Sequence, residues 1–163
     1  MEIEEIFLPE CVVAQKRISS KKRALEQLSE LLVSATPSLT QTEVFEGLVA
    51  RERLGSTGLG HGAAIPHGRL KAVTRPVCAF MQLQAGVDFD AVDNQPVDLI
   101  CALLVPEEST SEHLELLAML AEIFGDETFC KQLRAADSDA ALYRLLVQWK
   151  SGFEVSQQSR PCA

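Results

Sequence analysis

Apolar residues recur at intervals of three and four in several parts of the chain, a spacing typical of amphipathic helices. The first such part covers residues 21–33 and directly follows two serines at 19–20 that can cap a helix. Thr40 and Glu43 form a capping box, which predicts a second helix that ends near Arg51. We expect the apolar stripe of the first helix to face the core.

The second half of the chain predicts three more helices. Ser109 and Glu112 form another capping box, so a helix is expected to begin there and to carry His113 in its first turn. Residues 126–133 predict a short helix, and residues 139–149 predict another with leucines on its buried side.

Two apolar runs bounded by turn residues predict β-strands. The run at 77–83 precedes a turn sequence at 93–96, and the run at 97–105 is almost uninterrupted, as expected for a strand covered on both faces. Residues 63–65 predict a short strand that ends at Pro66, because proline removes a donor from the ladder. Since helices and strands interleave, we expect a single α/β domain with a mixed β-sheet flanked by helices.

The composition of the chain changes between the second predicted helix and Pro66. Four glycines fall within eight residues: Gly55, Gly58, Gly60 and Gly62. Neither a regular helix nor a central strand tolerates that density, so a shaped loop is expected. His67, directly after Pro66, is then expected at a stiff exit from the short strand.

The overall composition limits the class of protein. A length of 163 residues with 47% hydrophobic content suits one domain with a sizeable core. The net charge of -8 argues against nucleic-acid binding, because that needs clustered Lys and Arg. We expect the negative charge to serve solubility. Residues 1–150 should form the domain, whereas residues 151–163 lack periodicity and are expected to be a disordered tail.

Three features predict a cytoplasmic protein. The first seven residues alternate acidic and apolar side chains and lack the basic start of a signal peptide. No apolar run is long enough for membrane insertion. The five cysteines are odd in number, scattered and without a CxxC motif, so they are expected to be reduced thiols.

His67, Arg51, His113 and the glycine-rich loop together suggest phosphoryl chemistry, although each alone has a simpler explanation. A neutral imidazole can attack phosphorus without a separate base, and its ordinary pKa of about 6.5 leaves much of it neutral near pH 7. Arg51 could offer a guanidinium fork, and His113, kept neutral by a helix N-terminus, could donate one hydrogen bond. Loop N–H groups would then cradle the phosphate at Gly55, Ser56, Thr57 and Gly58.

Three segments resemble a known family. Residues 51–68, RERLGSTGLGHGAAIPHG, look like the phosphorylation-site sequence of mannitol/fructose-type enzyme IIA domains of the phosphoenolpyruvate:sugar phosphotransferase system, and most closely like the nitrogen-regulatory branch. Residues 89–99 and 103–106, with the His-Leu pair at 113–114, agree with this, so the resemblance covers roughly residues 1–150. The Ile-Pro-His motif is the most specific part.

The resemblance implies a phosphotransferase-system protein that works through a phosphohistidine, with His67 phosphorylated, Arg51 contacting phosphate and His113 as the second active-site histidine. Nothing carries over to His61, which we expect to be a solvated loop residue. The family fold is a mixed sheet flanked by helices. The implied phosphoryl donor is a small histidine phosphocarrier protein of the nitrogen branch, and the implied targets are regulatory proteins in nitrogen, carbon or potassium control. No metal or organic cofactor would be needed.

Other functions remain open from the sequence. A sugar-specific IIA component would pass phosphate to a IIB domain; the polar C-terminal tail, with no attached IIB or membrane domain, favours a free-standing regulator. A metal-dependent hydrolase could use His61, His67 and His113, but the first two lack the i, i+4 spacing of zinc-binding helices. A dinucleotide-binding loop would need a strand before the glycines and a helix after them. A plain interaction module with a structural His67 is the last alternative.

Overall fold

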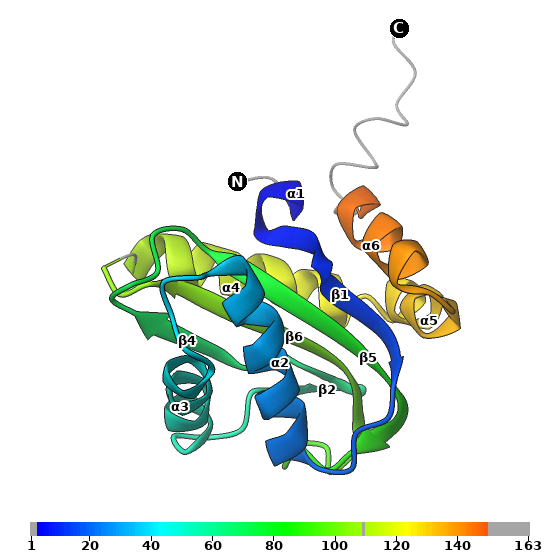
Figure 1. Cartoon of the computed structure of the whole chain (residues 1–163). Coiled ribbons are helices and arrows are strands. Elements are labelled where there is room, and N and C mark those ends of the chain that lie inside the picture. Colours follow the sequence, from blue (N-terminus) through cyan, green and yellow to red (C-terminus); the bar gives the residue numbers. More distant parts are fainter. Residues whose placement is uncertain (1–2, 109, 150–163) are drawn as a thin grey trace, which may run out of the picture.

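The computed structural model describes residues 3–108 and 110–149, which fold into three layers with a mixed β-sheet in the middle (Figure 1). The path through the sheet runs β1 (Phe7–Lys16), β5 (Val77–Val87), β6 (Val97–Pro106), β3 (Ala63–Ala64) and β2 (Gly58–Gly60), and β4 (His67–Leu70) also pairs with β6. The parallel pairs are β1 with β5 and both β3 and β4 with β6, whereas β5 with β6 and β2 with β3 are antiparallel. The expected mixed sheet is confirmed.

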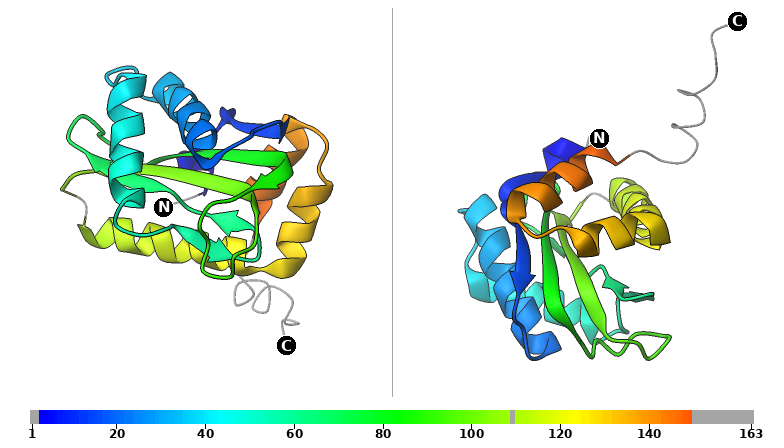
Figure 2. Two further views of the ribbon diagram at one scale, coloured as in Figure 1. Left: turned by 90° about the horizontal axis from the view of Figure 1, so that it is seen from below. Right: turned by 90° about the vertical axis from the view of Figure 1, so that its right-hand side faces the viewer.

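Helices cover both faces of the sheet (Figure 2). One face carries α2 (Lys21–Ala35) and α3 (Gln41–Glu52), and the other carries α4 (Thr110–Gly125), α5 (Glu127–Ala135) and α6 (Asp139–Gln148). A one-turn helix, α1 (Ile3–Ile6), precedes β1. Within the described residues, no helix is both long and apolar enough to cross a membrane.

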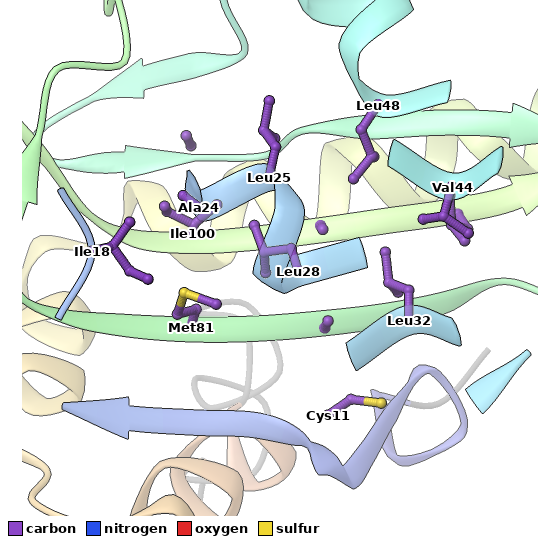
Figure 3. Close-up of a cluster of buried hydrophobic side chains, with 14 of the residues drawn as sticks. Cys11, Ile18, Ala24, Leu25, Leu28, Leu32, Val44, Leu48, Met81 and Ile100 are labelled. Carbon is purple, nitrogen blue, oxygen red and sulfur yellow. The ribbon is translucent and has the colours of Figure 1, made fainter. Parts of the chain in front are cut away.

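The almost uninterrupted apolar run of β6 is explained by its position between two cores. Leu99 and Leu103 pack in the cluster beneath α4, whereas Ile100 and Leu104 pack in the cluster beneath α2. Figure 3 shows the cluster beneath α2, in which leucines of that helix point toward the sheet. Helices on both faces bury most side chains of this strand, so the alternation of polar and apolar residues disappears.

The predicted helix starts are confirmed where the structure describes them. The Ser20 hydroxyl accepts a hydrogen bond from Arg23 N at 3.1 Å, and the Thr40 hydroxyl accepts one from Glu43 N at 3.2 Å. These bonds satisfy N–H groups that a helix start would otherwise leave without partners. The capping box expected at Ser109 and the tail expected at residues 151–163 lie outside the described residues.

Strands β1, β2 and β4 were not predicted. β1 contains Pro9 and Glu10, and its pairing with β5 shifts register between Phe7 and Val12. Proline is tolerated there because β1 is an edge strand and the irregularity removes the need for a donor at that point. The buried positions of β1 therefore do not alternate, and the period-2 pattern that identifies strands is absent.

The position expected for His67 needs a correction. The short strand ends at Ala64, and His67 is the first residue of β4 rather than the exit from a strand into a loop. Ala64 pairs with Ile100 and His67 pairs with Leu103, so β3 and β4 follow one another along the same neighbour, β6. The segment between them, which contains Pro66, breaks the ladder as proline requires.

Gln82 is a buried polar side chain that connects β1, β5 and the C-terminal end of α5. Its side chain accepts a hydrogen bond from Gln15 N at 2.9 Å and donates to the carbonyls of Leu133 and Ala136 at 2.6 and 2.8 Å. Gln82→Leu removes the hydrogen bonds that this buried amide makes to three other residues and should lower the free energy of unfolding by about 2 kcal/mol. For a chain of this size the melting temperature should fall by about 4–8 °C.

The matched control for Gln82→Leu is Gln84→Leu, because Gln84 lies on the same strand but is exposed. Its side chain bonds to Arg17 at the surface, so its replacement should change the free energy of unfolding by less than about 0.5 kcal/mol. Equal losses for the two variants in urea unfolding would contradict a special role for the buried amide.

Candidate active site

His67 lies at the edge of the sheet, on the face covered by α4. Residues paired across a ladder share a face, and the partner of His67, Leu103, packs in the cluster beneath α4. The half-buried imidazole has its Nδ1 atom 2.8 Å from the backbone carbonyl of Ile65. A carbonyl can only accept, so Nδ1 carries the proton and Nε2 keeps a free lone pair. The backbone thus selects the tautomer of His67.

Arg51 brings a guanidinium against that lone pair. It lies in the last turn of α3, whose start is fixed by the Thr40 cap. Arg51 Nε donates to His67 Nε2 at 3.3 Å, and Arg51 Nη1 donates to the Gly55 carbonyl at 2.9 Å. Because two separate N–H groups are engaged, the plane of the guanidinium is oriented as well as its charge.

His113 reaches the same imidazole from the first turn of α4. The His67 and His113 rings meet edge-to-face, with centroids 5.3 Å apart and planes at 67°. His113 Nε2 is buried and has no hydrogen-bond partner among the described residues. A buried ring nitrogen without a partner carries a free-energy cost, which a ligand atom arriving beside His67 could remove.

The pKa values of His67 and His113 are both lowered, which favours the neutral form of each ring. Burial lowers the pKa of His67; the hydrogen bond to the Ile65 carbonyl opposes this, and the positive charge of Arg51 adds to the lowering. Burial also lowers the pKa of His113, followed by the charges of His67 and Arg69. The site therefore keeps two neutral imidazoles below the pH at which a free histidine would gain a proton.

The tautomer and both pKa shifts can be measured by ¹⁵N NMR of the imidazole rings. We expect His67 to carry its proton on Nδ1, and we expect both histidines to titrate at lower pH than in the urea-unfolded chain. Each folded pKa is depressed, so the unfolded state takes up protons first and stability falls as the pH drops through the unfolded value of about 6.5. His67→Gln and His113→Gln assign the signals. A His67 proton on Nε2 would contradict the assignment.

The glycine-rich loop joins α3 to β2, and most of its polar groups are turned inward. The Ser56 hydroxyl donates to the Phe89 carbonyl at 2.7 Å and accepts from Gly58 N at 3.1 Å. Thr57 gives both its backbone N–H and its hydroxyl to the Glu52 carboxylate. Gly55 N also has a partner, the Glu52 carbonyl at 3.2 Å. Of the N–H groups expected to cradle phosphate, those of Gly55, Thr57 and Gly58 are thus engaged within the protein.

His61 makes different contacts from those of His67 and His113. His61 is exposed on the turn between β2 and β3, where its N–H donates to Asp93 at 2.9 Å and its Nδ1 lies 3.6 Å from Glu127. In the part of the chain described, no group of three His, Cys, Asp or Glu side chains is arranged to hold a metal ion. The residues brought together are His67, Arg51 and His113.

Two residues near the site were not singled out from the sequence. Arg69 follows His67 by two positions on β4 and so shares its face, and its charge lowers the pKa values of both histidines. Glu52 follows Arg51 and has a nearly buried carboxylate. The alternation of side chains along a strand that begins at His67 could have indicated Arg69. No local pattern indicates Glu52, because its partners lie in other segments.

Comparisons with known proteins agree with this geometry. Residues 5–149 match the family model described as phosphoenolpyruvate-dependent sugar phosphotransferase system, EIIA 2. A nitrogen regulatory protein from Klebsiella oxytoca is 45% identical over 155 residues, covering 94% of this chain and 95% of that one. A fructose-specific EIIA component from Haloferax volcanii is 31% identical over 147 residues, covering 90% and 96%.

A solved structure gives the same result for the fold. The nitrogen regulatory protein IIA-Ntr from Neisseria meningitidis superposes with a TM-score of 0.82 at 44% identity, covering 87% of this chain and 97% of that one. The family model spans both the sheet and the helices that carry Arg51 and His113. The chain therefore belongs to the EIIA 2 family of the phosphoenolpyruvate-dependent sugar phosphotransferase system.

Proposed function

We propose that this protein is a phosphoryl carrier of the nitrogen-related phosphotransferase system and that Nε2 of His67 is the atom that accepts the phosphoryl group. The observation that carries the proposal is the unprotonated Nε2, held between the Arg51 guanidinium and the ring of His113. The similarity to nitrogen regulatory proteins over nearly the whole chain supports the nitrogen branch. The phosphoryl donor would be the histidine of a small phosphocarrier protein.

The transfer exchanges one P–N bond for another. The lone pair of His67 Nε2 forms a bond to phosphorus as the bond to the donor imidazole breaks, and that electron pair stays on the donor nitrogen. His67 Nδ1 keeps its proton and its hydrogen bond to the Ile65 carbonyl, so no base is needed at this residue. The lowered pKa of His67 keeps the attacking nitrogen available at neutral pH.

Arg51 and His113 would stabilise the charge that spreads over the phosphoryl oxygens. The Arg51 Nε–H that now faces Nε2 can turn to an incoming oxygen, and a guanidinium offers further N–H groups beside it. His113 Nε2 has no partner to give up, so it can bond to a second oxygen if it carries the ring proton. Both side chains lie beside the acceptor nitrogen before the reaction begins, which favours strong electrostatic stabilisation.

The phosphoryl group would also act as a signal. It adds up to two negative charges at a half-buried surface site, which is enough to change which protein docks there. We assign the targets to regulatory proteins of nitrogen, carbon or potassium control in the cytoplasm, and residues 1–150 to the domain that they recognise. Identical sets of proteins captured by the phosphorylated and unphosphorylated forms would contradict this switch.

A sugar-specific IIA component is the second candidate, because a fructose-specific relative is 31% identical over most of both chains. The two functions differ in the acceptor. A sugar-specific component should discharge quickly to a IIB domain, whereas a regulator should keep its phosphoryl group in the presence of that domain. Rapid discharge to a fructose IIB domain would overturn the nitrogen-branch proposal and leave the chemistry at His67 intact.

The direct test is to incubate the protein with phosphoenolpyruvate, enzyme I and the phosphocarrier. We expect one acid-labile phosphoryl group per chain, and NMR of the ¹⁵N-labelled product should show phosphorus coupled to Nε2 of His67. Omission of the phosphocarrier is the control for direct transfer from enzyme I. A stable adduct on another residue, or no adduct at all, would rule out the proposed function.

A further inference from the structure

Glu52, the last residue of α3 and the neighbour of Arg51 in the chain, carries a nearly buried carboxylate. Its side chain is only 5% exposed, and its Oε2 lies 2.8 Å from Lys21 Nζ, at the start of α2. The Thr57 hydroxyl donates to Glu52 Oε1, and Thr57 N donates to Oε2 at 3.3 Å. Burying a charge is costly unless it is paired and hydrogen-bonded, so this arrangement stabilises a specific geometry of the loop.

Lys21 is itself held from a second side. Its Nζ lies 4.6 Å from the centre of the Phe89 ring and 3.4 Å from the Phe89 carbonyl, with Asp90 3.7 Å away. The same Phe89 carbonyl accepts the Ser56 hydroxyl. Four segments therefore meet behind the loop: the start of α2, the end of α3, residues 56–57 and residues 89–90. We call the three residues Lys21, Glu52 and Thr57 the loop anchor.

The loop anchor is connected to Arg51 through one carbonyl. Gly55 lies two residues before Thr57. Its carbonyl accepts a hydrogen bond from Arg51 Nη1 at 2.9 Å, and its N–H donates to the Glu52 carbonyl at 3.2 Å. The position of Thr57 thus restricts the position of the Gly55 carbonyl, which orients the guanidinium whose Nε faces His67. A small displacement of a group that stabilises charge is costly, because the stabilisation depends on fixed donors.

We infer that Glu52 and Thr57 are positioning residues for phosphoryl transfer, which hold the Gly55 carbonyl and through it the Arg51 guanidinium against His67. The inference rests on the proposed function and assigns the glycine-rich loop a different task from a phosphate cradle. The N–H groups of Gly55, Thr57 and Gly58 and both loop hydroxyls are engaged within the protein, so the loop serves as a scaffold and Arg51 makes the contact with the phosphoryl group.

Thr57→Val is the variant that tests this most cleanly. It keeps the shape of the side chain and the charge pair of Glu52 with Lys21, and it removes only the hydroxyl that bonds Oε1. The rate of phosphoryl transfer should fall about tenfold at saturating phosphocarrier with little change in KM, because docking does not involve a side chain that is 7% exposed. Thr57→Ser, which keeps the hydroxyl, should recover most of the rate. Glu46→Gln, an exposed carboxylate of the same helix, should leave the rate unchanged.

A double-mutant cycle with Arg51→Ala decides whether the effect passes through Arg51. If it does, Thr57→Val should cost almost nothing further once Arg51 is absent. A full tenfold loss from Thr57→Val in the Arg51→Ala background would overturn the inference, because the effect of the hydroxyl would then be independent of Arg51. Wild-type transfer by Arg51→Ala alone would instead contradict the role of Arg51 in the proposed function, so the two failures are distinguishable.

Discussion

His67→Ala is expected to abolish acceptance of the phosphoryl group, with a fall in rate of at least about 10⁴-fold, because no other group can form the same P–N bond. The nearest alternative, His113, has its Nε2 buried, and its ring meets His67 edge-to-face. The rate is measured by following the acid-labile phosphoryl group after mixing with the phosphorylated phosphocarrier. His67 is only half-buried, so the variant should remain folded and its circular dichroism spectrum should be unchanged.

The control for His67→Ala is His61→Ala. His61 lies in the same sequence motif, six residues earlier, but its side chain is 71% exposed and contacts Glu127 rather than His67. It should accept the phosphoryl group at close to the wild-type rate. An acid-labile adduct that persists in His67→Ala and disappears in His61→Ala would mean that the wrong histidine has been assigned.

Apart from the one-turn helix α1, the helices could be predicted from the sequence because their determinants are local. Ser20 and Thr40 cap α2 and α3 through N–H groups only three residues away, and the apolar residues of each helix recur within a few turns. β1 could not be predicted in this way. Its Pro9 and Glu10 break the alternation, and its strand conformation depends on pairing with β5, which lies far along the chain.

The same distinction applies to the candidate site. The Ile-Pro-His motif is contiguous, so the sequence alone indicates His67, and Arg51 and His113 lie at predicted helix ends. The environment of Glu52 depends on Lys21, whose contact with it requires α2 and α3 to pack side by side. Loop donors also could not be assigned, because a glycine-rich sequence does not say whether its N–H groups point outward or toward a buried carboxylate.

Arg51→Ala should lower the rate of phosphoryl transfer about 10²–10³-fold, which corresponds to about 3–4 kcal/mol of transition-state stabilisation. The guanidinium is the cationic side chain in direct hydrogen-bond contact with His67 Nε2, at 3.3 Å. Arg51→Lys keeps the charge but cannot reach His67 and the Gly55 carbonyl with two oriented N–H groups, so it should recover only a small part of the rate. The loss should appear in kcat rather than in KM, because the contact strengthens as charge develops on the phosphoryl oxygens.

Arg53→Ala is the matched control for Arg51→Ala. It removes the same charge two residues further along, at the exposed C-cap of α3, where the side chain does not bond to His67. If general attraction between basic residues and a phosphorylated donor limited the rate, both variants should be slower to a similar extent and the loss should diminish in high salt. If instead Arg51 stabilises the transferring group, its loss should persist in high salt, and Arg53→Ala should transfer at close to the wild-type rate. Equal, salt-sensitive losses would show that Arg51 contributes attraction alone, whereas a salt-resistant loss confined to Arg51 assigns it to the transition state.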